Sequence, residues 1–195
     1  MDNNKLDKII KPIKNPIHKS DLMFTMINHA IEKFKKEYGG FDLTPDFQRG
    51  HVWVYDQKKL YIENILKGVV TPGGLTIQFN CPNFELDKNS DSDLPDGFQC
   101  IDGLQRLTAV KEFIKGQIFP FGLHLEDLRG SKYDIRSVKY KISINVYDFQ
   151  YKKDLLEHYI TLNAGGTPHS KEEIDRIRNM INELKGEDQY QGINP

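Results

Sequence analysis

The stretch that decides the fold is FQCIDGLQRLT, residues 98–108, in which an apolar run ends in Asp102-Gly103 and an amphipathic segment follows at once. This order predicts a strand, a tight turn and the first turn of a helix. The first backbone N–H groups of a helix lack intrahelical acceptors and attract anions. Gly103 lets a ligand approach the backbone, and the planar Arg106 guanidinium suits phosphate. The stretch therefore predicts a phosphate-binding turn, with a purely structural turn and an exposed Arg as the alternative.

Three side chains in or near this turn are candidates for chemistry. Arg106 stands near the start of a helix, where the dipole disfavours a cation, and this placement indicates a bound anion. Asp102 is a carboxylate that could hold Mg²⁺ or polarise a water molecule, or it could be the N-cap of the helix. His51, from a second polar loop, has the right side chain for a general base, although a single loop histidine is more often structural.

Two further polar loops accompany the turn. The segment TPDFQRGHVW, residues 44–53, sets Gln48 and Arg49 among aromatic residues that we expect to pack, and LNAGGTP, residues 162–168, is a glycine loop before a helix. Gln48 and Arg49 could line a site or tie down their own loop. Asn163 could bind a nucleotide or hold its own turn. Three polar loops joined by short helices suggest one composite site.

Together these loops resemble the N-terminal domain family of GmrS/GmrD-type modification-dependent restriction proteins, which belongs to the ParB/sulfiredoxin-like superfamily. Residues 45–53 match its Pro-x-aromatic-Gln-Arg-x-x-x-Trp motif in full. Residues 102–108 match its Asp-Gly-Gln-Gln-Arg-Leu-Thr motif, with Leu104 in place of the first Gln. Residues 163–168 supply the Asn-x-Gly loop. The resemblance covers about residues 20–185, which is nearly the whole chain.

The resemblance implies an α+β fold of the ParB/sulfiredoxin-like type, with a small mixed sheet surrounded by helices. It also implies nucleotide binding at the Asp-Gly-x-Gln-Arg loop, and in some members NTP hydrolysis or DNA nicking. On this basis Asp102 and Arg106 are the expected catalytic residues, and Asp102 is the expected ligand of Mg²⁺. The expected nucleotide-binding residues are Gln48, Arg49, Gly103, Gln105, Arg106, Thr108 and Asn163.

Three functions follow as hypotheses. The first is an NTP-binding, Mg²⁺-dependent phosphohydrolase or nucleotide sensor in a microbial or phage defence setting. The second is a non-catalytic module that binds a nucleotide or a defence-system protein and acts by occupancy. Long family members carry a C-terminal HNH-type nuclease domain, and the sequence up to Pro195 has no second His/Asn cluster, which favours this module. The third is a DNA nickase that uses the same pocket.

The amino-acid composition restricts the expected partners and cellular location of the protein. The net charge of −1 and pI of about 6.6 argue against a protein that coats nucleic acid constitutively, but they are compatible with a local basic patch. Cys81 and Cys100 have no metal-ligand spacing, so reduced thiols in a cytoplasm are the simplest interpretation. No apolar run approaches the roughly 20 residues of a membrane span, and no signal-peptide core is present. We therefore expect a cytoplasmic protein without membrane contact.

The chain divides into a basic, flexible and extended arm at residues 1–19, one domain at residues 20–186 and a frayed tail at residues 187–195. The long polar segment 80–97 is expected to be a mobile surface insertion that folding does not require. Ser170 begins an expected capping box. Helices are predicted at about residues 21–38, 56–68, 104–116, 125–128, 154–162 and 171–186, and strands at 41–44, 75–79, 98–101 and 142–146.

Overall fold

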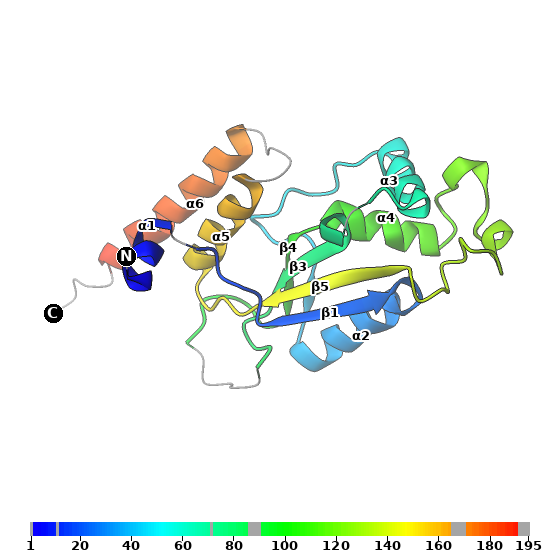
Figure 1. The fold of residues 1–195 in the computed structure, drawn as a ribbon. Helices are drawn as coiled ribbons and strands as arrows, with labels where there is room; N and C mark the ends of the chain where they lie inside the picture. The colour runs from blue at the N-terminus through cyan, green and yellow to red at the C-terminus, as the bar shows by residue number, and fades with distance from the viewer. Residues whose placement is uncertain (1, 11, 71, 86–90, 165–170, 191–195) are drawn as a thin grey trace.

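The computed structural model describes residues 2–10, 12–70, 72–85, 91–164 and 171–190. They form an α+β fold around a five-stranded mixed sheet with strand order β1-β5-β3-β4-β2 (Figure 1), which confirms the predicted fold class. The β1–β5 and β3–β4 pairs are antiparallel, and the β3–β5 and β2–β4 pairs are parallel. The strands are β1 (His18–Met23), β2 (Phe41–Asp42), β3 (Thr76–Asn80), β4 (Phe98–Asp102) and β5 (Lys141–Tyr147).

Helices pack at both ends of this sheet. Figure 1 shows α5 and α6 side by side at one end and α3 beside α4 at the other. The α-helices are α1 (Asn3–Ile10), α2 (Ile27–Tyr38), α3 (Tyr55–Lys67), α4 (Leu104–Ile114), α5 (Lys152–Ala164) and α6 (Lys171–Tyr190). Short 3₁₀ turns are η1 (Phe24–Met26), η2 (Pro72–Leu75), η3 (Pro120–Gly122) and η4 (Leu125–Leu128). No helix within the described ranges is long and apolar enough to cross a membrane.

The main core lies on one face of the sheet. Alternate residues of a strand point to opposite faces, and in β5 this places Ile142, Ile144 and Val146 inward. They belong to one apolar cluster with residues of α2, α3 and α4, including Ile27 and Ile62. Helix α4 is thereby packed against the sheet from which it starts, which fixes the β4–α4 turn.

A second, smaller core joins the other face of the sheet to α5 and α6. Ile101 of β4 and Tyr147 of β5 pack there with Phe47, Tyr159 and Ile177. Phe47 is fully buried against the Tyr159 ring, at 5.6 Å between centroids. The polar loop that precedes α3 is therefore anchored to α5 through its own aromatic residue.

The chain before residue 24 contains more regular structure than predicted. Residues 3–10 form α1, and His18–Met23 form the edge strand β1, so the extended arm and the helix predicted from residue 21 are both wrong here. The Ile17 N–H donates to the Val146 carbonyl at 2.8 Å, and Lys14 pairs with Asp148 at 2.6 Å. These contacts extend the sheet to the N-terminal side of the domain start predicted at residue 20.

Residues 80–97 are expected to be dispensable for folding, but residues near both ends of that segment make specific hydrogen bonds in the fold. Asn80 is buried, and its side chain exchanges two hydrogen bonds with the Phe149 backbone, at 2.7 and 3.1 Å. Asn83 donates to the Tyr38 carbonyl and accepts from the Gly97 N–H, both at 3.0 Å. Buried amide side chains with paired backbone partners stabilise the fold, so only the middle of the segment remains a candidate insertion.

The C-terminal predictions have mixed outcomes. Helix α6 continues to Tyr190, past the predicted end at residue 186. The Ser170 cap, the glycine loop at residues 165–168 and the last five residues of the predicted tail lie outside the described residues.

Candidate functional site

The β4–α4 turn depends on Gly103. Gly103 is the N-cap residue of α4 with φ of +98°, and its carbonyl accepts the Leu107 N–H at 2.9 Å. A Cβ atom at this position would lie 2.7 Å from Ile77 Cδ1. Positive φ and this close approach to β3 together require glycine. Asp102 makes no capping hydrogen bond, so the alternative in which Asp102 caps the helix is wrong.

Asp102 and Arg106 face each other across the turn. The Arg106 guanidinium donates to the Asp102 carboxylate in an i,i+4 ion pair, with the two side chains 20% and 37% exposed. A carboxylate at this end of a helix offsets the unfavourable interaction of the guanidinium with the dipole. Tyr61 lies within electrostatic range: burial raises its pKa to about 12, and Arg106 opposes that rise. The two predicted catalytic residues are therefore brought together.

Two glutamines fasten the polar loop at residues 48–53 to this turn. The Gln48 amide donates to the Ile101 carbonyl at 3.0 Å. In the opposite direction, the Gln105 amide donates to the Gly50 carbonyl at 2.8 Å and accepts the N–H groups of Val52 and Trp53, both at 3.1 Å. In each Gln-Arg motif the glutamine thus ties the two segments together. Direct contact of either glutamine with a nucleotide stays a prediction.

Arg49 is the second arginine of the site. It is half-buried and makes no hydrogen bond or ion pair with another described residue. Tyr159 of α5 donates from its hydroxyl to Gln48 Oε1 at 3.4 Å. Burial, followed by Glu173, raises the pKa of Tyr159, and Arg176 and Arg49 oppose the rise. Arg49 therefore lies within electrostatic range of the Tyr159 hydroxyl, on the side of the site formed by α5.

Helix α6 supports the same loop from outside. Arg176 donates to the Asp46 and Phe47 carbonyls, both at 2.8 Å, and pairs with Glu173 at 2.7 Å. Neither Tyr159 nor Arg176 was anticipated from the sequence. Phe47 beside Gln48 was the one sequence feature that indicated a neighbouring element, because an aromatic residue in a polar loop is buried only if other side chains pack against it.

Two other predicted residues have structural contacts. Thr108 Oγ1 lies 3.3 Å from His51 Nδ1, so Thr108 holds the loop histidine. Asn163 is in the last turn of α5, not in a loop, and its amide donates to the Tyr159 carbonyl at 2.7 Å. Asn163 thus holds its own backbone, as the structural alternative predicted. Nucleotide contacts of Thr108 and Asn163 stay predictions.

Comparison with protein families now identifies the chain. The family described as GmrSD restriction endonuclease, N-terminal domain, matches residues 27–142, which is more than half of the 195 residues. The chain belongs to this family. Comparisons with curated proteins and with solved structures found no match. The matched range contains both Gln-Arg motifs and the whole β4–α4 turn.

Metal binding by this GmrSD N-terminal domain can be examined for the acid residues that the structure describes. No group of three or more His, Cys, Asp or Glu side chains that could hold an ion occurs in the part of the chain that the structure describes. Mg²⁺ is commonly bound by one or two carboxylates together with substrate phosphates and waters. Asp102 fits that arrangement only as the protein ligand of a metal that arrives with phosphate.

Neither cysteine of this GmrSD domain is suited to nucleophilic chemistry. Cys81 and Cys100 are buried free thiols, and burial raises the pKa of each to about 12. A thiol in this state is not ionised at neutral pH, and the thiolate is the reactive form. The oxygen and nitrogen groups at the β4–α4 turn therefore remain the candidates for chemistry.

His158 of α5 is a buried histidine of the GmrSD domain. It is buried between the Tyr147 and Phe149 rings, at 4.5 and 4.8 Å between centroids. Burial, followed by repulsion from Lys14, lowers the pKa of His158 to about 4. An unfolded histidine titrates near 6.5, so as the pH falls from about 6.5 to 4 the unfolded state takes up the proton first. His158 therefore destabilises the fold progressively across this window.

We expect His158→Gln, which cannot titrate, to flatten this pH dependence. Between pH 7 and 4.5 the wild type should lose roughly 2 kcal/mol more of its free energy of unfolding than the variant, measured by urea denaturation. His29→Gln, at an exposed position of α2, is the control and should follow the wild type. Equal acid sensitivity of His158→Gln and wild type would contradict the prediction.

Proposed function

We propose that this domain binds a nucleoside triphosphate through its phosphates at the β4–α4 turn, and that it serves a restriction-related defence role. The observation that carries the proposal is the Asp102–Arg106 ion pair at the turn, to which Gln48 and Gln105 tie the loop that carries Arg49. Membership of a restriction endonuclease domain family supports the biological setting.

The charges at the turn suit a phosphate chain with a metal. Guanidinium groups form forked, charge-assisted hydrogen bonds with phosphate oxygens, and the first amides of α4 add donors at the positive end of the helix dipole. In the proposed complex Arg106 exchanges its carboxylate partner for a phosphate. That exchange would free Asp102 to hold Mg²⁺, which would neutralise phosphate charge and polarise a water molecule.

Arg106→Ala is expected to weaken NTP binding at least tenfold, because one charge-assisted contact contributes about 1.5–3 kcal/mol. Calorimetric titration with each of the four NTPs and Mg²⁺ measures the affinity. Arg178→Ala is the matched control, since the Arg178 side chain of α6 is 63% exposed and pairs with Asp175 on its own helix. Absence of saturation with every NTP at millimolar concentration in the wild type would refute the proposal.

A non-catalytic nucleotide-binding module is the second candidate. The observation that favours it is the Asp102–Arg106 pair, in which the carboxylate is already neutralised by its own helix. Steady-state phosphate release separates the two functions: a module saturates with NTP and releases no phosphate above background. Nicking of supercoiled plasmid that is lost in Asp102→Asn or Arg106→Ala would instead favour the nickase hypothesis.

A further inference from the structure

A basic cavity lies apart from the β4–α4 turn. It has a volume of about 460 Å³ and is formed by the C-terminal end of α3, η2 and the segment that leads into β5. Four lysines and two tyrosines line it, and the other described residues in its lining are apolar or glycine, with no carboxylate among them. The polar lining residues are Lys67, Lys132, Tyr133, Lys139, Tyr140 and Lys141.

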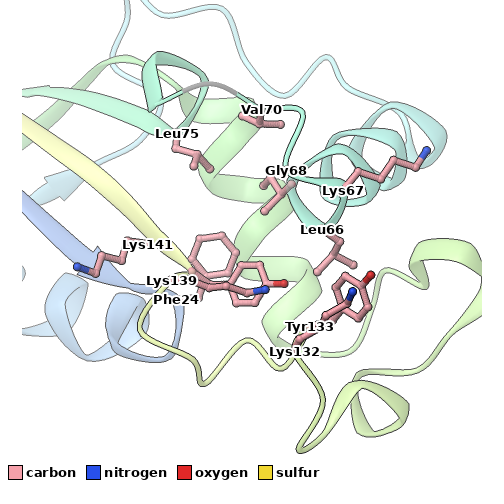
Figure 2. A pocket seen from close by; sticks show the side chains of 12 residues that line it. Phe24, Leu66, Lys67, Gly68, Val70, Leu75, Lys132, Tyr133, Lys139 and Lys141 are labelled. Carbon is pink, nitrogen blue, oxygen red and sulfur yellow. The ribbon is translucent and has the colours of Figure 1, made fainter.

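The lysines are concentrated around aromatic rings. The ammonium groups of Lys132 and Lys139 lie 5.1 and 5.5 Å from the centre of the same ring, that of Tyr133. Figure 2 shows Lys132 beside Tyr133, while Lys67 and Lys141 extend outward on opposite sides of the lining residues. No ion pair joins any of these lysines to a carboxylate among the residues described. Two ammonium groups on one ring without a counterion would be stabilised by an anion.

An unsatisfied hydroxyl gives independent evidence for a ligand. Tyr140 lines the cavity and is only 5% exposed, and its hydroxyl has no hydrogen-bond partner within the described ranges. Leaving a buried hydroxyl unpaired is unfavourable. The ammonium group of Lys139 lies 4.6 Å from the centre of the Tyr140 ring. The Tyr140 hydroxyl could therefore donate to an oxygen of an anion that Lys139 also attracts.

The shape favours a chain of nucleotides over a single small anion. A second cavity of about 220 Å³ shares Lys67 and Tyr133 with the first, and Phe121 and Leu123 contribute to its apolar lining. The Tyr133 and Phe121 side chains are 38% and 49% exposed. Proteins that bind single-stranded nucleic acid place exposed aromatic rings, on which bases stack, beside cations that follow the backbone.

The charge pattern of the segment at residues 129–141 agrees with this ligand. It contains five cationic residues and one acid, in a chain whose net charge is −1. Arg129 pairs with Glu126 and Arg136 with Asp134, so the three lysines carry the excess that phosphate recognition requires. The five cations are Arg129, Lys132, Arg136, Lys139 and Lys141.

We propose that this pair of cavities binds a single-stranded nucleic acid, with a phosphate held by Lys132, Lys139 and the Tyr140 hydroxyl and with bases stacked on Tyr133 and Phe121. The site is separate from the β4–α4 turn, and the proposal does not depend on NTP binding there.

The test uses the full chain and a fluorescein-labelled oligodeoxythymidylate of about 12 nucleotides, a length in the usual range of single-strand sites. Fluorescence anisotropy is measured in low salt without NTP or metal, so that failure of the NTP proposal leaves the result unaffected. The variant Lys132→Ala/Lys139→Ala should weaken binding at least tenfold and reduce its salt dependence. Tyr133→Ala should also weaken binding, while Tyr133→Phe should retain it.

The charge-matched control is Lys36→Ala/Lys171→Ala, which removes two exposed lysines from α2 and α6. Circular dichroism verifies that each variant is folded. Equal affinity of the cavity variant and the control variant would overturn the proposal. Tighter binding of duplex than of single strands, or equal binding of free thymidine monophosphate and the oligonucleotide, would also overturn it. Tyr140→Phe removes only the hydroxyl and should cost a smaller but measurable part of the affinity.

Discussion

Replacing Gly97 by Ala is expected to lower the free energy of unfolding by about 3–5 kcal/mol, the largest stability effect that we expect from a single methyl group in this domain. A Cβ at Gly97 would lie 2.5 Å from both the backbone nitrogen and the backbone oxygen of Gly40, and φ at Gly97 is +91°. The Phe98 N–H donates to the Gly40 carbonyl at 3.0 Å beside this contact. The clash would therefore separate β2 from the start of β4.

Urea denaturation measures this effect. Gly50→Ala is the matched control, because a Cβ at Gly50 meets no atom within 4 Å. The control should change stability by about 0.5 kcal/mol or less, as at an ordinary surface position. Similar unfolding midpoints for the two variants would show that the contact between Gly97 and Gly40 relaxes without cost.

The second large effect concerns catalysis and rests on the proposed function. Asp102→Asn keeps the size of the side chain but loses its charge, so it can neither hold Mg²⁺ in the same way nor polarise water. We expect phosphate release to fall at least about a hundredfold. NTP affinity should change much less than in Arg106→Ala. Phosphate release and calorimetric affinity are measured on the same preparation.

Asp21→Asn is the control for this variant. Asp21 lies on the edge strand β1, which β5 and β3 separate from β4, and accepts a hydrogen bond from Ser143. It should leave turnover unchanged. Full turnover in Asp102→Asn would remove Asp102 from the mechanism. Clear NTP binding with no turnover in the wild type would instead favour the non-catalytic module.

Strands with alternating apolar residues were the most predictable part of the fold. β3 and β5 follow this pattern because one face of each carries most of the buried side chains, whereas β4 was predictable as an apolar run because both of its faces are buried. β1 was missed because HKSDLM has no such alternation. An edge strand can be held by backbone hydrogen bonds to one neighbour, and its mainly exposed side chains then carry no pattern. Asn80 and Asn83 were misjudged for a related reason: a polar side chain that satisfies a buried backbone has the same sequence as a loop residue.

The residues of the candidate site could be predicted from the sequence, but the contacts that each of them makes could not. The motifs located Asp102, Arg106 and both glutamines. The sequence could not show that Gln48 and Gln105 bind each other's backbone segments, since those contacts join residues more than 50 positions apart. The basic cavity was not predicted either. Its lysines come from α3, from the segment before β5 and from the first residue of β5, and only the fold brings them together.

Because Gln48 and Gln105 join segments far apart in the sequence, backbone order in the loop at residues 48–53 depends on the folding of the whole domain. The amide hydrogens of Val52 and Trp53 are protected by a side chain that lies 53 and 52 residues further along the chain. Bringing residues 52 and 105 together closes a long loop, and the entropy lost in doing so is not offset by contacts within the loop at residues 48–53 alone. These two exposed-loop amides should therefore exchange with solvent deuterium only when Gln105 is released. Their exchange rates therefore distinguish two causes of lost binding. A variant that loses binding but keeps slow exchange at Val52 and Trp53 has lost a ligand contact. A variant with fast exchange at these amides has lost the structure of the site.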